Sequence, residues 1–166
     1  MGQRTADRPY RVEVARTMPV EASVAFAWVA DPRTHPRFIP LTRLDGAARE
    51  APGPGESFAM VSGPGARRGR RGFVDRMVVE EVARPSSRTG TVGRTAVRKT
   101  GPALLGTAGF DVVPLDADRC VVVWWEEAYL AGPWPRRPNA VLVGVALRVM
   151  MHVSLHRLGR LLARRG

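Results

Sequence analysis

The sequence has very little cysteine, histidine or lysine. Cys120 is the only cysteine in 166 residues, so no internal disulfide can form. It lies within an apolar run, where a small buried thiol is the default expectation. The three histidines, His35, His152 and His156, have no cysteine cluster near them, and no metal site is predicted. A chain without disulfides suits a reducing compartment, so we expect a cytoplasmic protein.

Several catalytic and targeting motifs are also absent. There is no GxSxG, no P-loop and no GxGxxG between a strand and a helix, so hydrolase triads, nucleotides and dinucleotide cofactors have no support. No cofactor is predicted. The first residues, MGQRTADRPYRVEV, contain no apolar core of a signal peptide. The longest apolar run, Ala140 to Leu147, is far shorter than the ~20 residues that span a bilayer. We therefore expect a soluble protein with no transmembrane segment.

The positive charge is carried almost wholly by arginine. Lys99 is the only lysine among 26 basic residues, and the formal net charge is +11. Arginine in place of lysine is typical of a GC-rich, bacterial-like composition. The functional interpretation is a surface that attracts nucleic acid, anionic lipid or an acidic ligand. Arginines cluster between Arg67 and Arg71 and in the last turns of the chain, but no interleaved aromatic series or zinc-finger spacing accompanies them. Nucleic-acid binding is therefore the weaker interpretation.

The hydrophobic pattern changes from helical to alternating and back to helical along the chain. Residues 1–9 are polar and predicted to be loose, and a strand is expected over 11–17. A short helix over 20–30 and a second, proline-limited turn of helix follow. Further strands are expected over 41–50, 56–62, 72–83, 89–100, 104–114 and 120–130. The glycine-rich strand at 89–100 is expected at a sheet edge. Consecutive strands with short turns and helices gathered on one face indicate an antiparallel α+β fold, with residues 1–166 forming one domain.

A long amphipathic helix is predicted from Pro138 to the end of the chain, with Asn139 as its N-cap. One face is apolar except for the Ser154 hydroxyl, and it holds Leu147, Met150, Met151, Ser154, Leu155, Leu158, Leu161 and Leu162. The opposite face carries Arg148, His152, His156 and Arg160, which we expect to be solvated. A third side is apolar and holds Leu142, Val145, Val149 and Val153. Its cover is expected from loops, from a homodimer, or from an apolar partner or membrane surface.

This order of elements resembles the SRPBCC or START-related superfamily, which has the helix-grip fold. The segments that carry the resemblance are VEVARTMPVEASVAFAWVADP, RTHPRFIP, PGPGESFAM, VDRMVVEEVARP and DADRCVVVWWEEAYL, followed by the long closing helix. The similarity is greatest to the polyketide cyclase/dehydrase branch. It implies a curved antiparallel sheet of about six to seven strands wrapped around the C-terminal helix, with two short helices after the first strand. It also implies a cavity between sheet and helix for an apolar or amphipathic molecule.

The resemblance suggests which side chains line that cavity. It turns Trp125, Glu127 and Tyr129 inward, and Glu127 becomes the best catalytic candidate, since a carboxyl group among apolar residues needs a partner or a raised pKa. A shift of one residue would give Glu126 and Trp124 these roles. Glu127 could equally reach water or pair with an arginine. In the strand over 73–82, Asp75 or Arg76 could be the buried polar group, and the Met77 face is favoured. The predicted lining is Phe38, Met77, Trp125, Glu127, Tyr129, Leu147, Met150, Met151 and Ser154.

Three functions follow as hypotheses. The first is binding of a small hydrophobic or amphipathic ligand, lipid or polyketide-like, in the cavity. The second is a polyketide cyclase/dehydrase that uses a cavity carboxylate, so enzymatic activity stays open. The third is a partner- or anion-binding module that uses the basic C-terminal helix. The superfamily shares no catalytic residue, so the resemblance implies fold more strongly than function.

Overall fold

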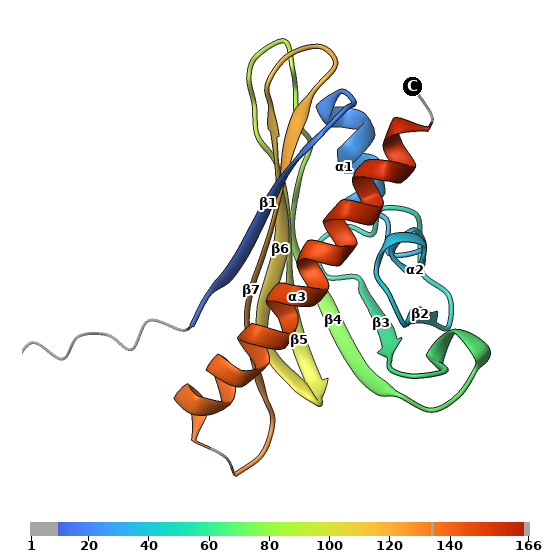
Figure 1. Ribbon diagram of the computed structural model, residues 1–166, viewed down its shortest axis with the longest axis vertical. Coiled ribbons are helices and arrows are strands. Elements are labelled where there is room, and N and C mark those ends of the chain that lie inside the picture. Colours follow the sequence, from blue (N-terminus) through green and yellow to red (C-terminus); the bar gives the residue numbers. More distant parts are fainter. Residues whose placement is uncertain (1–9, 134, 165–166) are drawn as a thin grey trace, which may run out of the picture.

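A seven-stranded antiparallel sheet wraps around one long helix. The computed structural model describes residues 10–133 and 135–164, and the predicted loose segment 1–9 lies outside these ranges. The elements in chain order are β1 (Val12–Met18), α1 (Ala22–Ala30), α2 (His35–Phe38), β2 (Thr42–Asp45), β3 (Ser57–Ser62), the 3-10 helix η1 (Ala66–Arg68), β4 (Phe73–Ala83), β5 (Gly93–Pro102), β6 (Leu104–Pro114), β7 (Cys120–Leu130) and α3 (Arg136–Ala163). Figure 1 shows α3 crossing the sheet, with α1 and α2 beside its C-terminal half. The predicted helix-grip architecture is confirmed.

The strands lie in the order β1-β7-β6-β5-β4-β3-β2, and every neighbouring pair is antiparallel. The prediction that β5 lies at an edge is wrong, because it pairs with both β4 and β6 and the edges are β1 and β2. Three inward residues of β5 are small or polar for another reason. Gly93 packs so closely on α1 that an added Cβ would lie 2.8 Å from Phe26 Cδ2, while Thr95 and Lys99 face a cavity.

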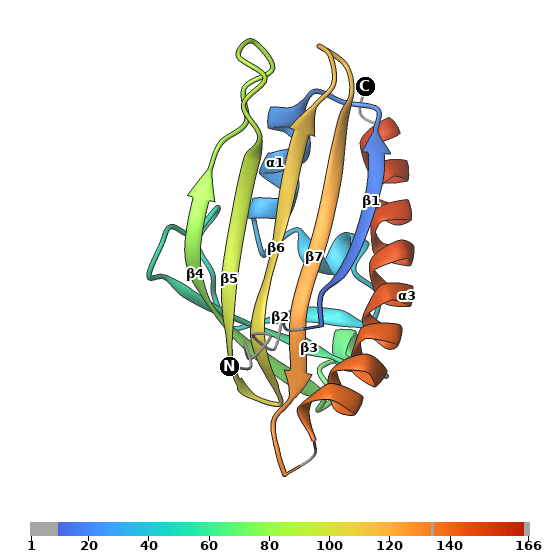
Figure 2. The same cartoon turned by 90° about the vertical axis from the view of Figure 1, so that its left-hand side faces the viewer.

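Helix α3 is tied to the end of β7 by Asn139. Its side-chain amide donates to the Leu130 carbonyl at 2.9 Å and accepts from the Leu130 N–H at 3.0 Å. The helix begins at Arg136, so the prediction that Asn139 is its N-cap is wrong. These bonds fix where the helix leaves the sheet. From there α3 packs on β1 and β7, and Figure 2 shows it running beside β1.

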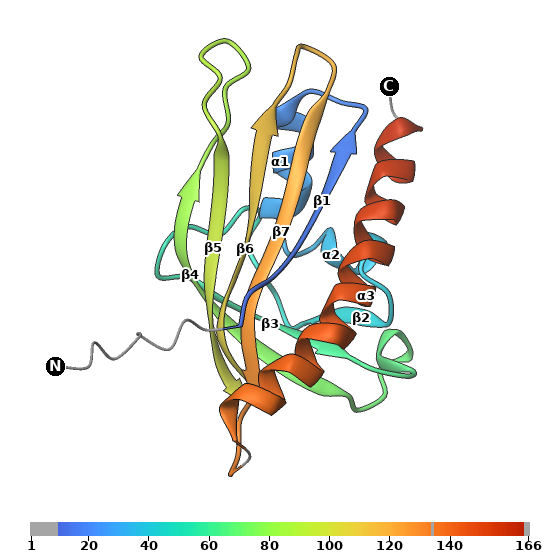
Figure 3. The same ribbon diagram turned by 60° about the vertical axis from the view of Figure 1, so that its left-hand side comes forward.

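The two halves of α3 have different surroundings. In the C-terminal half, Met151, Leu155, Leu158 and Leu162 are fully buried in the core with α1, α2 and the inner faces of β1, β6 and β7. In the N-terminal half, Leu142, Val145 and Val149 are exposed, Leu142 by 75%, and Val153 continues this exposed row into the C-terminal half. Arg148, His152, His156 and Arg160 are exposed, as predicted. Figure 3 shows the sheet curling from β1 beside α3 round to β2 near α2.

By length and composition alone, α3 could cross a membrane between Pro138 and Ala163. The short apolar run that the sequence shows up to Leu147 therefore understates the apolar length of the whole helix. Helices that cover a core pass the same test, and the buried side chains of α3 pack on the sheet. The apolar character of this helix is thus partly explained by the core it covers.

Candidate functional site: an apolar cavity with a buried ionic cluster

A cavity of about 400 Å³ lies between the inner face of the sheet and the N-terminal half of α3. Most of its lining is apolar: it includes Ile39, Phe58, Met60, Met77, Val79, Val97, Leu104, Phe110, Trp124, Val143, Leu147 and Met150. Polar side chains reach it from the sheet and from α2: these are His35, Thr42, Ser62, Asp75, Thr95, Lys99 and Glu126. A cavity of this size and lining suits a small molecule that is mainly hydrophobic and carries a few polar groups.

Three of the nine predicted lining residues face this cavity: Met77 from β4, and Leu147 and Met150 from α3. Phe38, Met151 and Ser154 are instead fully buried in the core beyond the cavity. The Ser154 hydroxyl donates to the Met150 carbonyl at 2.7 Å, one turn back along the helix. This bond satisfies its polar group without a ligand.

The inward face of β7 is the opposite of the one predicted. Trp124 and Glu126 face the cavity, and Glu126 is only 3% exposed. Trp125, Glu127 and Tyr129 lie on the outer face. The guanidinium of Arg11 stacks over the Trp125 ring at 4.5 Å, and Glu127 is 3.6 Å from the same arginine. The prediction that Glu127 and its face line the cavity is therefore wrong by one residue, the shift that exchanges the two faces of a strand.

Three buried charged side chains from different strands meet in the cavity. The Lys99 ammonium on β5 lies 2.5 Å from the Asp75 carboxylate on β4 and 3.4 Å from the Glu126 carboxylate on β7. Strand β6 separates β5 from β7, and its residues here are small: Gly106 pairs with Lys99 and Ala108 with Glu126. No large side chain of β6 therefore separates Lys99 from Glu126.

Burial and mutual attraction determine the charges of this cluster. Burial raises the pKa of Glu126, and the nearby Asp75 adds to this, although Lys99 opposes it. Burial would lower the pKa of Lys99, but the carboxylates of Glu126 and Asp75 outweigh it and the pKa is raised. We therefore assign a charged Lys99 beside a Glu126 that holds a proton more readily than an exposed glutamate does. Asp75 Oδ1 and Glu126 Oε2 are buried without a hydrogen-bond partner within the described part of the chain.

His35 contributes a buried imidazole to the same cavity. Its Nε2 lies 3.0 Å from the Val29 carbonyl, so this nitrogen carries the proton because a carbonyl only accepts. The ring packs against Phe38 and Phe110, with centroids 5.5 and 6.1 Å away. Burial lowers the pKa of His35. In residues 10–133 and 135–164, no three His, Cys, Asp or Glu side chains are arranged to hold a metal ion.

Two features of the sequence point to this cluster, although the alternation of residue types along the strands does not reveal it. Lys99 is the only lysine, and Asp75 is an acid on the face of β4 that the resemblance favoured, so Asp75 was one of the two alternatives for the buried group. The meeting of Lys99 with Glu126 could not be inferred from the sequence. The strands that hold Lys99 and Glu126 are not neighbours in the sheet.

Comparison with known proteins agrees with this architecture. A family described as polyketide cyclase / dehydrase and lipid transport matches residues 9–163. A START superfamily protein from Mycobacterium smegmatis superimposes with a TM-score of 0.64 at 17% identity, covering 91% of this chain and 98% of the other. The Zhui aromatase/cyclase from Streptomyces sp. R1128 gives 0.63 at 14% identity, covering 94% of both. A hypothetical protein from Helicobacter pylori gives 0.69 at 15% identity, covering 94% and 89%. No curated protein matches the chain.

Because the identities of the solved structures to this chain are low, their similarity shows the fold alone. The family match spans nearly the whole sequence, from before β1 to the end of α3, and so includes every strand that lines the cavity. This chain therefore belongs to the polyketide cyclase / dehydrase and lipid transport family.

Proposed function

We propose that this protein binds a small, mainly hydrophobic molecule in the cavity and that Asp75, Lys99 and Glu126 recognise a polar group on it. The observation that carries the proposal is the ionic cluster, which lies buried in a mainly apolar cavity. Within the described residues Asp75 Oδ1 has no hydrogen bond, and Glu126 Oε2 has only the Lys99 ammonium, 3.4 Å away. Unsatisfied buried polar atoms cost stability, so a ligand group that hydrogen-bonds to them removes part of that cost.

The cluster favours a particular kind of ligand. Asp75 Oδ1 can accept a hydrogen bond from a ligand hydroxyl. Glu126, whose pKa is raised, can donate its proton to a ligand carbonyl or accept from a hydroxyl once it is ionised. The remaining lining suits an aliphatic or aromatic body. A lipid or polyketide-like molecule with neighbouring carbonyl and hydroxyl groups has this combination.

The test is native mass spectrometry of the purified protein, combined with titration of a hydrophobic fluorescent dye. Leu147→Trp fills the cavity from α3 and is expected to abolish ligand and dye binding. Val149→Trp adds the same side chain on the exposed side, where Val149 is 62% exposed, and is expected to leave binding intact. A wild-type protein that holds no ligand and binds no dye would contradict the proposal. Equal dye binding by the two variants would also contradict it.

A polyketide cyclase/dehydrase is the second candidate, favoured by the convergence of two carboxyl groups and one ammonium in the cavity. In such a reaction Asp75 would remove a proton from the carbon beside a carbonyl, and that carbon would attack a second carbonyl. Glu126 would give its proton to the oxygen of the second carbonyl as the carbon–carbon bond forms. Loss of water would follow: the Glu126 carboxylate would take a second proton from the same carbon, and the protonated Asp75 would give its proton to the leaving hydroxyl, which restores both groups.

This candidate is tested with a short poly-β-ketone, following cyclisation and the loss of water by mass. Glu126→Gln and Asp75→Asn should each lower turnover by about 100-fold or more, which is typical for a positioned acid or base. Glu127→Gln, on the outer face, is the matched control and should retain activity. Full activity of Glu126→Gln would remove this residue from the mechanism.

A further inference from the structure

We propose that a second pocket, separate from the cavity, binds a small polyanion that carries several phosphate groups. The pocket has a volume of about 270 Å³ and lies between α2, η1 and the C-terminal third of α3. Its lining consists of Leu161 and five arginines: Arg37, Arg67, Arg157, Arg160 and Arg164. None of these residues lines the hydrophobic cavity.

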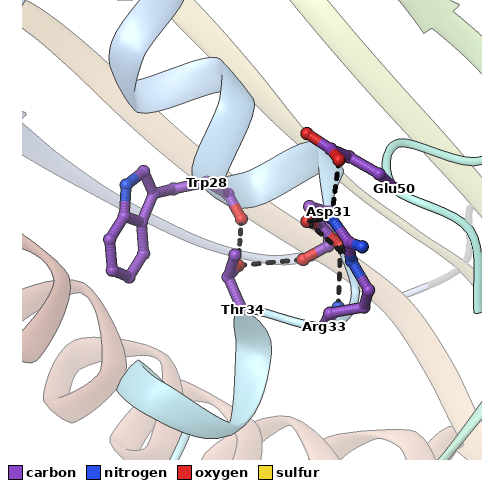
Figure 4. Close-up of polar contacts among 5 residues, drawn as sticks. All are labelled: Trp28, Asp31, Arg33, Thr34 and Glu50. Carbon is purple, nitrogen blue, oxygen red and sulfur yellow. Dashed lines mark hydrogen bonds and ion pairs between the residues drawn. The ribbon is translucent and has the colours of Figure 1, made fainter.

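The five arginines, called here the arginine pocket, lack acidic partners. Within residues 10–133 and 135–164, none of them forms an ion pair with a carboxylate. Several arginines elsewhere are paired with carboxylates. Arg33, only four residues before Arg37, contacts Asp31 at 2.8 Å and Glu50 at 2.9 Å, as Figure 4 shows. The positive charge of the arginine pocket is thus local and uncompensated.

Three of these arginines repel one another along α3. Arg157, Arg160 and Arg164 are spaced by three and four residues, which brings them to one face of the helix. Like charges at this spacing destabilise a helix, although the negative end of the helix dipole offsets part of the repulsion. A bound anion would remove the repulsion that remains.

Arg37 is held in place from the other side of the pocket. Its guanidinium stacks over the Trp28 ring at 4.8 Å. The Thr34 hydroxyl lies 2.5 Å from the Trp28 carbonyl oxygen and 2.8 Å from that of Asp31, which fixes the turn between α1 and α2. In Figure 4 the Trp28 indole points away from the Asp31–Arg33 pair. A guanidinium stacked on a ring keeps its N–H edge available for an anion.

The chemistry and shape of the pocket favour phosphate on a small molecule. Guanidinium groups bind phosphate oxygens in pairs, with charge-assisted hydrogen bonds. The site is a depression lined by side chains from three separate elements, which suits a compact ligand better than a bilayer or a duplex. Its lining offers no exposed aromatic ring on which a nucleic-acid base could stack. A chain of linked phosphates therefore fits it best.

The proposal is tested by calorimetric titration with inorganic triphosphate at low and at physiological salt. The wild type is expected to bind one equivalent, more weakly at higher salt. Combining Arg37→Glu with Arg160→Glu should weaken binding by about tenfold or more, the effect of losing charge-assisted contacts. Combining Arg37→Gln with Arg160→Gln should weaken it in the same direction without adding negative charge.

The control combines Arg84→Glu with Arg88→Glu, which changes the net charge by the same amount at exposed positions that do not line the arginine pocket. This control should bind triphosphate like the wild type. Dye binding in the hydrophobic cavity should persist in all variants, which separates this proposal from the proposed function. Equal weakening in the control and pocket variants would overturn the proposal. Binding of anionic vesicles or a single-stranded oligonucleotide without binding of triphosphate would overturn it too.

Discussion

Lys99 pairs with two carboxyl groups inside the cavity, and its replacement should show how much the burial of these groups costs in stability. Lys99→Met leaves Asp75 and Glu126 buried without their cation, and we expect a loss of about 3–5 kcal/mol in the free energy of unfolding at pH 7. Without the ammonium, the pKa of Glu126 should rise further, so the loss should grow as the pH rises and shrink towards pH 5. Urea unfolding at several pH values measures this.

Arg98→Met is the control for this substitution, since Arg98 adjoins Lys99 in β5 and pairs with Glu80 at the surface, where both side chains are exposed. Surface ion pairs contribute little, so we expect a change below about 1 kcal/mol. If Lys99→Met were equally mild, the buried cluster would not be charged as assigned.

The buried imidazole of His35 should make the protein less stable in mild acid. Burial lowers its pKa, so the folded protein takes up a proton less readily than the unfolded chain does. This contribution to stability is complete above about pH 6.5 and is lost as the pH falls towards the lowered value. His35→Gln should remove that part of the pH dependence. Unfolding by urea between pH 7.5 and 5 measures it, with His152→Gln, at an exposed position on α3, as the control. A slope that survived His35→Gln would assign the effect to other groups.

At the scale of the secondary-structure element, two glycines of α3 should respond differently to the same change. A Cβ on Gly144 would lie 2.8 Å from Val12 Cγ2 and closer still to the Tyr10 ring, because the helix approaches β1 there. A Cβ on Gly159 would have its nearest neighbour at 3.3 Å, on the flexible side chain of Arg16. Gly144→Ala should therefore destabilise the protein by about 1–3 kcal/mol. Gly159→Ala should be neutral or stabilise it by up to about 1 kcal/mol.

Thermal unfolding of the two alanine variants measures this difference, each serving as the control for the other. If both were stabilised, α3 would not pack against β1 as closely as described. Gly144→Ala should also weaken dye binding, because Val143 and Ala146, on either side of the glycine, line the cavity.

We have not assigned a loop, a partner or a second copy of the chain that would cover the apolar row on the exposed side of α3. Leu142, Val145 and Val149 are exposed among the described residues, and a homodimer through this row remains a prediction from the sequence. Leu142→Ser should change the oligomeric state seen by light scattering if the row is a dimer interface. An unchanged monomer would exclude this.

At the scale of the whole molecule, the sheet and α3 share one core, so we expect a single unfolding transition. The core contains residues from β1, α1, α2, β6, β7 and α3, and none of these elements buries its apolar face alone. Tryptophan fluorescence and far-UV circular dichroism should therefore give coincident midpoints in urea. A ligand in the cavity should raise both midpoints together, because at 100 times its Kd it adds about 2.7 kcal/mol to the free energy of unfolding. Separate transitions would contradict the prediction that the chain is one domain.

Much of the fold could be predicted because the pattern is local. Strands over 104–114 and 120–130 were placed at their observed bounds, since turn residues flank regular apolar runs. The faces of α3 were also predictable, because its leucines repeat at helical spacing. The prediction chose the wrong inward face of β7, because both faces of this strand are largely apolar. Val121 to Trp125 carry no alternation, and only contact with Arg11 and Lys99 distinguishes the two sides.

The resemblance to a known superfamily implies the helix-grip fold. Residue spacing and composition are enough to predict the order of elements, the amphipathic closing helix and the excess of arginine. These properties depend on spacing and composition, which hydrophobic burial and backbone geometry translate directly into structure. Only the folded structure shows which charged side chains lie close together. Lys99 reaches Glu126 across β6, and Arg37 joins Arg160 across the gap between two helices. Such encounters depend on the curl of the sheet and on strand register, which join residues far apart in the chain and leave no local pattern.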